Sequence, residues 1–339
     1  MIPFDQDLAL HKQRSVVVCN CDLNHQTVLQ PEDRLSGRSV MFVHGERGVN
    51  MGSRHLRGGQ LGKMLQVFDP SVLVSWKALG ELAPHQFRPD VVICHKSALE
   101  DDALLPIARR WARAGTIFCA DIVDGQPKQH RRVRNLVRSY ICASRTEFDW
   151  RSSRRERCYF VPHHVDLRIL PLRPQRSNWS LGYLGQRRNA QHLEKIKLQV
   201  LEDTPELFET GGRLLRRFLE DHSHHYSVRR YSRDEGFKPP TKIYLASHVG
   251  AVAIVSREDP ESLQAVGSDY PFLSVSSRLS DVAETIRFAE ERMGMGEHER
   301  ALKAMEILRR DFCPARVVQS LHVALREEML HTDVLRQHA

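Results

Sequence analysis

The sequence has no apolar run approaching the roughly 20 residues needed to span a bilayer. Its first 15 residues, "MIPFDQDLALHKQRS", lack the order of basic and apolar regions typical of a secretion signal. Hydrophobic residues make up 41% of the chain, enough for a substantial core. We therefore expect a cytoplasmic globular protein, and the length of 339 residues favours two domains.

The spacing of a metal site is also absent. Most of the seven cysteines lie in apolar, strand-like runs, where reduced thiols are usually buried. The pair in "CNC" at 19–21 is separated by one residue, which is too few for the usual zinc pair, and no second pair follows at a suitable spacing. We predict no metal site.

The net charge of +8 is concentrated in the segment 128–157, which contains "KQHRRVRNLVRS" and "RSSRRER". Such runs usually form solvated helix faces. They also suit a phosphate-bearing substrate, an anionic membrane surface or nucleic acid. Nucleic acid is the least favoured of these partners, because the basic runs lack interleaved aromatic residues.

Short apolar runs alternate with longer amphipathic stretches along most of the chain. Consecutive apolar positions favour strands covered on both faces, and therefore parallel sheets flanked by helices. A proline- and arginine-rich segment at 166–177 is typical of a linker. We predict an α/β protein of two doubly wound, Rossmann-like domains facing across a cleft, residues 1–170 and 171–339, with the last helix a candidate to pack back on the first domain. Strands are expected at 39–44, 72–76, 90–95, 116–124, 140–144, 180–185 and 272–277, and helices of the second domain near 190–201, 206–221, 279–292, 297–311 and 315–330.

Ligands of open α/β sheets bind beyond the carboxyl ends of the strands. The glycine-rich loop at 44–60 has neither dinucleotide-binding nor P-loop spacing, but its arginines are suited to phosphate or carboxylate. His95 ends an apolar strand and is a candidate general base or hydroxyl-binding group, or a structural histidine. Asp121 and Asp124 lie at the end of the next predicted strand, near the same sheet edge, and are candidates for the base or for helix caps.

The segment "DEGFKPPTKIYLASHVGAVAIVSREDP" (234–260) predicts a helix begun by two prolines and ended near Gly250, followed by a buried strand. Lys238 and Lys242 reinforce the partial positive charge of the helix start. Arg187 and Arg188 follow the strand that ends at Gly185, directly before another predicted helix. Both places are therefore candidate diphosphate sites.

Four stretches resemble the GT-B glycosyltransferases, in particular the group-one (glycosyltransferase family four-like) class. They are "GSRHLRGGQLGKML", "RPDVVICHKS", "YICASRTEFDWRSSRRERCYFVPHHVD" and "EGFKPPTKIYLASHVGAVAIVSREDPESLQAVG". Many members carry two glutamates seven residues apart, the second of which binds the donor ribose. Here Glu235 occupies the first position, whereas Lys242 occupies the second.

The resemblance implies transfer of a sugar, of the hexosyl type and without a metal, from a nucleotide diphosphate-sugar to a saccharide or lipid-linked hydroxyl acceptor in polysaccharide or glycoconjugate biosynthesis. The nucleotide-sugar is a substrate, and no cofactor is expected. Peripheral contact with an anionic membrane stays open. The alternatives are a nucleotide-sugar epimerase and a non-catalytic binding protein. The implied donor-binding residues are Gly185, Arg187, Arg188, Glu235, Lys238, Thr241, Lys242 and Glu258; the acceptor-binding residues are Arg54, Arg57 and Gln60; and the catalytic candidates are His95, Asp121 and Asp124.

Overall fold

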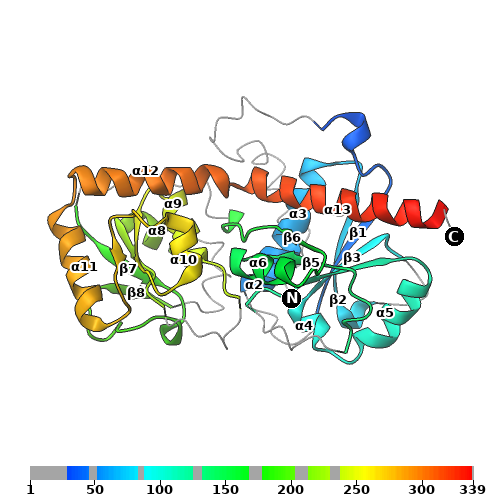
Figure 1. Ribbon diagram of the computed structural model, residues 1–339, viewed down its shortest axis with the longest axis horizontal. Helices are drawn as coiled ribbons and strands as arrows, with labels where there is room; N and C mark the ends of the chain where they lie inside the picture. Colours follow the sequence, from blue (N-terminus) through cyan, green and yellow to red (C-terminus); the bar gives the residue numbers. More distant parts are fainter. Residues whose placement is uncertain are drawn as a thin grey trace.

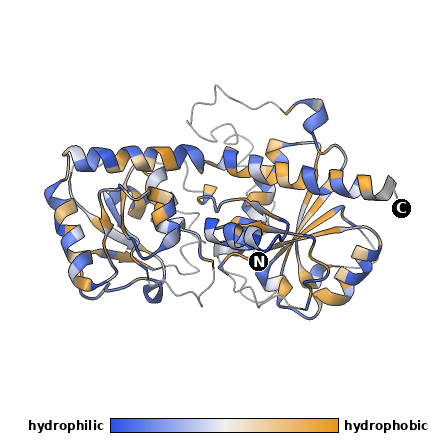
Figure 2. Ribbon diagram, in the orientation of Figure 1, coloured by the Kyte–Doolittle hydropathy of each residue, from blue (hydrophilic) through white to orange (hydrophobic). Residues whose placement is uncertain are grey.

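The computed structural model describes residues 29–45, 52–82, 88–124, 132–167, 178–202, 213–229 and 237–337. Within these residues the chain forms two α/β domains side by side, with a long helical run along one edge of both (Figure 1). In Figure 2 the strands of the first sheet are mainly hydrophobic, while the helices around them alternate polar and apolar residues. No helix in this part of the chain is both long and apolar enough to cross a membrane.

The first domain is built on a sheet of six parallel strands in the order β2-β1-β3-β4-β5-β6. Every residue of β1, β3, β4 and β5 is buried, because the sheet is covered on both faces. The strands are β1 (Ser39–His44), β2 (Leu73–Ala78), β3 (Val91–His95), β4 (Ile117–Asp121), β5 (Ser139–Cys142) and β6 (Cys158–Phe160).

Helices cover both faces of this sheet. The strands share one hydrophobic core with α3 (Leu61–Phe68) and a second with α5 (Leu104–Arg113). Shorter α4 (Lys96–Leu99) follows β3, and α6 (Arg145–Ser153) joins β5 to β6. α2 (Gly52–Arg54) and α3 are joined by a wider π-helical segment, η3 (His55–Gln60), and the backbone stays helical at Arg54 and Leu61.

The second domain has a sheet of five parallel strands in the order β11-β10-β9-β7-β8. The sequence prediction of two doubly wound α/β domains is therefore confirmed. The strands are β7 (Leu181–Leu184), β8 (Gln199–Leu201), β9 (His224–Tyr226), β10 (Val252–Ser256) and β11 (Leu273–Ser274). The longer helices are α8 (Arg213–Asp221), α9 (Thr241–His248), α10 (Pro260–Val266), α11 (Leu279–Glu291) and α12 (Gly296–Asp311).

The helix predicted near 190–201 is wrong. A short 3-10 turn, η6 (Arg187–Asn189), leads into further turns and then into β8, which pairs with β7. His192 has a φ of 60°, a left-handed conformation that does not occur within a helix. Leu193 and Ile196 contact the core from these turns, so their three-residue spacing imitated a helical pattern.

The last helix, α13 (Pro314–Gln337), continues the line of α12 and lies on the first domain (Figure 1). Its Val317, Leu321 and Leu325 belong to the core that contains α3. Buried Glu328 also forms an ion pair with Arg157 (2.5 Å). The C-terminal helix therefore completes one wall of the first domain.

Candidate functional site

Two cavities lie where the strand order of each sheet changes direction. In the first domain this point is between β1 and β3, and in the second it is between β7 and β9. Crevices at these switch points are the usual ligand sites of open α/β sheets. The first cavity includes His44, which ends β1, and His95, which ends β3. The second includes Tyr183 of β7 and Ser227, which follows β9.

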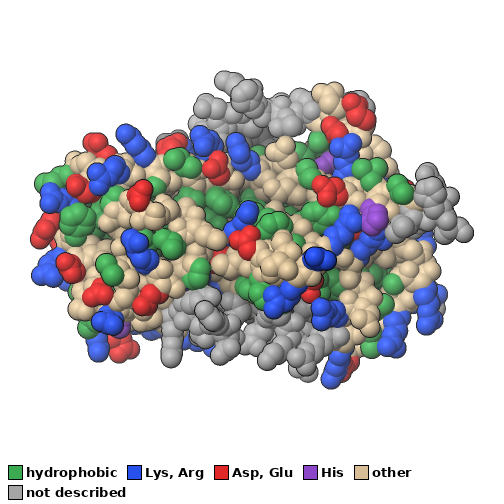
Figure 3. Space-filling model, in the orientation of Figure 1, with side chains coloured by type: hydrophobic (Ala, Val, Ile, Leu, Met, Phe, Trp, Pro, Cys, Tyr) green, Lys and Arg blue, Asp and Glu red, His purple; other side chains and the backbone are tan. Residues whose placement is uncertain are grey.

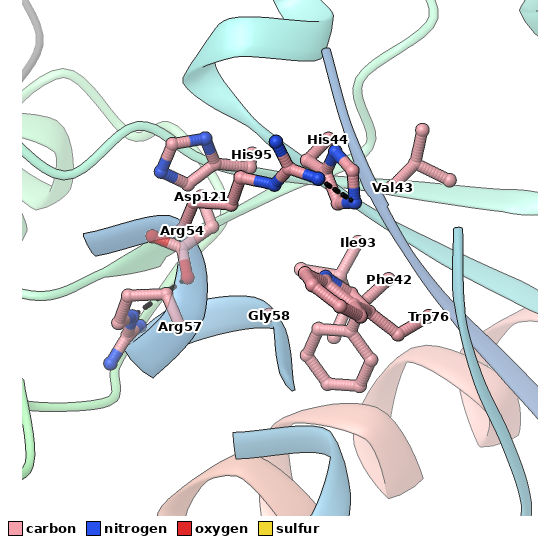
Figure 4. Close-up of a pocket in the computed structure, with 10 residues that line it drawn as sticks. All are labelled: Phe42, Val43, His44, Arg54, Arg57, Gly58, Trp76, Ile93, His95 and Asp121. Atoms are coloured by element: carbon pink, nitrogen blue, oxygen red, sulfur yellow. Dashed lines mark hydrogen bonds and ion pairs between the residues drawn. The ribbon is translucent and has the colours of Figure 1, made fainter. Parts of the chain in front are cut away.

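His95 is buried and electrically neutral. Its Nδ1 accepts hydrogen bonds from the backbone N–H (3.3 Å) and the hydroxyl (2.9 Å) of Ser97, so the ring proton is on Nε2. Burial, helped by the neighbouring cations, lowers the pKa of His95 to about 3. His95 is thus a weak base at neutral pH, and its Nε2–H is suited to donate a hydrogen bond in the first cavity (Figure 4).

Arg57 and Asp121 form a buried ion pair in the same cavity, with 2.8 Å between Nε and Oδ2 (Figure 4). Arg57 also donates to the carbonyls of Val161 (2.8 Å) and Pro162 (2.9 Å). Burial raises the pKa of Asp121, and the Arg57 guanidinium opposes that rise. The pair therefore fixes the end of β4 against the segment that leads toward the second domain.

Gln60, like Arg57, bonds to the segment that leads toward the second domain. Its amide donates to Asp166 (2.7 Å), and its oxygen accepts from the backbone N–H of Leu167 (2.9 Å). Arg54 is also buried and donates to the Nε2 of His44 at 2.9 Å. In the structure Arg54, Arg57 and Gln60 all bond within the protein, and their contact with an acceptor stays a prediction.

The second cavity, of about 70 Å³, is lined by residues from both domains. Asp124 belongs to the first domain and is 4.0 Å from the ammonium of Lys96. Thr241 and Lys242 line the cavity from the first turn of α9, and Lys238 lines it from the loop before this helix. The structure therefore brings one predicted catalytic residue together with three predicted donor-binding residues.

Gly185 provides space for Lys242. A Cβ atom at this position would lie 3.2 Å from Cε of Lys242, and the φ of 125° is strained for any residue but glycine. The ammonium of Lys242 lies 5.1 Å from the ring centroid of Tyr183. The missing side chain at Gly185 therefore lets the ammonium of Lys242, in the first turn of α9, lie beside the C-terminal end of β7.

The other predicted donor-binding residues lie elsewhere. Exposed Arg187 forms an ion pair with Glu202 (2.5 Å), and exposed Arg188 donates to Gln186 (2.9 Å). Glu258 accepts from the hydroxyl of Ser277 (2.5 Å), a bond that lowers its pKa. Among the described residues none of these three lines the second cavity. Glu235 lies outside the described residues.

The sequence analysis did not single out Arg229, which also lines the second cavity. Its guanidinium makes two bonds to buried Asp259 (2.7 and 2.9 Å) and donates to the carbonyls of Lys238 (2.7 Å) and Pro239 (3.2 Å). Arg229 therefore holds the loop before α9 in place. The sequence could have indicated Arg229 through its position just after a buried strand, the same feature that drew attention to Arg187.

No protein-family model and no curated protein matches the chain. Solved structures do match its fold. HepE from Anabaena, in complex with UDP and glucose, gives a TM-score of 0.61 at 14% identity, over 86% of this chain and 100% of that one. Sucrose-phosphate synthase from Thermosynechococcus elongatus gives 0.56 at 10% identity, over 87% and 100%. A proposed UDP-N-acetylglucosamine 2-epimerase from Listeria monocytogenes gives 0.53 at 8% identity, over 87% and 98%. The chain has the GT-B fold, as its resemblance in sequence implied.

Proposed function

We propose that the chain is a glycosyltransferase that moves a sugar from a nucleotide diphosphate-sugar to a hydroxyl acceptor. The observation that carries this proposal is the second cavity, which is lined by Lys242 in the first turn of α9, by Lys238 in the loop before it and by Asp124 from the opposite domain. A helix start supplemented by two cations favours a diphosphate. The anion would then be held where both domains reach the transferred sugar. HepE, which shares the fold, has been solved with UDP and glucose.

Lys238 and Lys242 would stabilise the charge that develops on the diphosphate as the glycosidic bond breaks. Arg229 would act indirectly, because its guanidinium is bonded to Asp259 and to two carbonyls of the loop. We propose metal-independent hexosyl transfer, since side chains supply this positive charge.

Asp124 is our preferred base for the acceptor hydroxyl, because it lines the second cavity and is partly exposed. Asp121 is a weaker candidate, because its carboxylate is buried and bonded to Arg57. The pKa of His95 suits donation of a hydrogen bond to a substrate oxygen better than removal of a proton.

We also propose that the acceptor is a saccharide or lipid-linked saccharide of polysaccharide or glycoconjugate synthesis, met at the cytoplasmic face of an anionic membrane. The support is the exposed face of α5, which carries Arg109, Arg110 and Arg113. Figure 3 shows basic side chains gathered on this end of the first domain.

A thermal-shift screen of UDP-, GDP-, CMP- and dTDP-sugars tests the donor site. We expect one nucleotide to raise the Tm by several degrees, because a ligand bound only to the native state stabilises it. Lys242→Ala should weaken this effect, whereas Lys303→Ala, at an exposed position on α12, should not.

If no nucleotide stabilises the wild-type protein, the donor site is wrong. Interconversion of nucleotide-sugars without an acceptor would instead indicate an epimerase. Binding without transfer to any acceptor extract would indicate a non-catalytic protein.

A further inference from the structure

The first cavity has more hydrogen-bond donors than acceptors. Within the described residues, four of its donor nitrogens have no partner: Nε and Nη1 of Arg54, Nη2 of Arg57 and Nε2 of His95. One acceptor, Oδ1 of Asp121, is also without a partner. The side chains that carry these atoms, those of Arg54, Arg57, His95 and Asp121, are each less than a tenth exposed. Because buried polar groups are normally hydrogen-bonded, this excess of donors points to a ligand rich in acceptors.

The charges of the cavity are also unequal. Nδ1 of His44 donates to the carbonyl of Gly45 (3.0 Å), which leaves its Nε2 to accept from Arg54. Burial lowers the pKa values of His44 and His95, so both rings are neutral. The remaining formal charges are the guanidiniums of Arg54 and Arg57 and the carboxylate of Asp121. Asp121 pairs with Arg57, so among the lining residues Arg54 is left without a carboxylate.

A buried cation without a carboxylate bonded to it is costly, and burial lowers the pKa of Arg54, although Glu81, which does not line the cavity, opposes that change. The guanidinium lies 5.5 Å from the ring centroid of Trp76 (Figure 4). The remaining space is about 10 Å³, close to the volume needed for one water-sized group. One oxygen of an anion fits this space, and the single negative charge of a carboxylate matches the one guanidinium left without a carboxylate, whereas a phosphate would bring nearly two charges.

The cavity is next to the proposed donor site. His95 in the first cavity directly precedes Lys96, whose ammonium is 4.0 Å from Asp124 of the second cavity. Asp121 ends β4 in the first cavity, and Asp124 of the second cavity follows it three residues later. The two cavities are therefore neighbours at the carboxyl ends of β3 and β4.

We propose that the first cavity binds a carboxylate of the substrate, with Arg54 as its charged partner and His95 as a hydrogen-bond donor. This inference rests on the proposed function and makes the substrate an acidic sugar of the uronic-acid type. The carboxylate belongs either to the transferred sugar or to the acceptor.

The first test uses acetate and its neutral analogue acetamide as probes of the full-length protein at constant ionic strength. We expect acetate to bind at least about tenfold more tightly than acetamide, measured by thermal shift. Arg54→Gln should remove this preference, while Arg287→Gln, on the exposed face of α11, should keep it. Arg54→Lys keeps the charge and serves if the Gln variant does not fold; it should weaken acetate binding by several-fold, because the forked donors are lost. Equal binding of acetate and acetamide by the wild-type protein would overturn the proposal and leave the cavity to a buried water.

Two further arms, with the same variants, determine whether the carboxylate belongs to the transferred sugar or to the acceptor. The donor arm compares UDP-glucuronate with UDP-glucose, and the acceptor arm compares glucuronate with glucose at saturating UDP. We expect a preference of about tenfold or more for the acid in one arm, lost in Arg54→Gln. If UDP binds but neither arm prefers the acid, the inference is wrong and the proposed function stands. If acetate binds through Arg54 but no nucleotide binds, the carboxylate site stands and the proposed function fails.

Discussion

Glu261 of α10 caps the first turn of α6 across the boundary between the domains. Its Oε1 accepts from the backbone N–H of Thr146 (2.6 Å) and from the hydroxyl of the same residue, and its Oε2 accepts from the N–H of Arg145 (3.2 Å). A carboxylate at a helix N-terminus is favourable, because the unpaired N–H groups there carry partial positive charge. One domain thus supplies the cap of a helix in the other.

We predict that Glu261→Ala lowers the free energy of unfolding by about 0.5–2 kcal/mol, because the part-buried N–H groups of Arg145 and Thr146 lose their acceptor. Glu261→Gln should cost less, since its amide oxygen still accepts. Urea denaturation measures both changes. Glu284→Ala, at an exposed position on α11, is the control and should stay within about 0.5 kcal/mol of wild type. An equally small change in Glu261→Ala would mean that the cap contributes no stability.

The buried pair of Arg57 and Asp121 should show strong coupling. We predict that Asp121→Asn alone lowers the free energy of unfolding by about 3–5 kcal/mol, because it leaves a buried guanidinium unpaired. Adding Arg57→Met should cost much less than the sum of the two single changes. A double-mutant cycle by denaturation measures the coupling energy, and additive costs would contradict the ion pair.

Gly185→Ala tests the route of Lys242 into the donor cavity. We predict weaker UDP binding by about tenfold, because the new methyl group would displace Lys242. Gly294→Ala is a matched control: its φ of 75° also disfavours alanine, but no atom lies within 4 Å of the added Cβ. Both variants should lose about 1–3 kcal/mol of stability through backbone strain. Calorimetric titration should show reduced UDP affinity in the Gly185 variant only, and equal affinity in both would disprove the steric role.

The buried histidines should make the protein sensitive to acid. Burial lowers the pKa of His95 to about 3 and that of His163 to about 4, from 6.5 in the unfolded chain. Below pH 6.5 the unfolded state therefore binds more protons, so stability is greatest above that pH and falls as the pH drops toward 4. Each group contributes a slope of at most about 1.4 kcal/mol per pH unit. Denaturation between pH 7 and 4.5 should give a shallower slope for His163→Gln than for wild type, while exposed His331→Gln should leave it unchanged.

The central strands of both sheets could be predicted from the sequence because they are buried along their whole length. The consecutive, mainly apolar residues of β1, β3 and β10 are typical of strands covered on both faces. β8 was missed because it is three residues long and only partly buried. Its pairing with β7 depends on residues distant in sequence, so the local sequence pattern of β8 does not predict this pairing.

The candidate site was predictable in position but not in its internal bonds. The rule that ligands gather at strand ends led to His95 and Asp124, and the charge at a predicted helix start led to Lys242; all three line the cavities. The resemblance to the GT-B glycosyltransferases also implied Gln60, whose partner Asp166 lies 106 residues further along the chain. Such pairs are set by the tertiary structure. The sequence therefore could not show whether Gln60 bonds to another residue of the protein or contacts a ligand.

The position of α13 has a consequence for how the two halves could be produced separately. Because Val317, Leu321 and Leu325 fill the core beside α3, a fragment that ends before the linker would expose an apolar surface. The complementary fragment would carry the helix that covers this surface. Co-expressed halves should therefore reassemble, whereas the first half alone should aggregate unless α13 is supplied as a peptide.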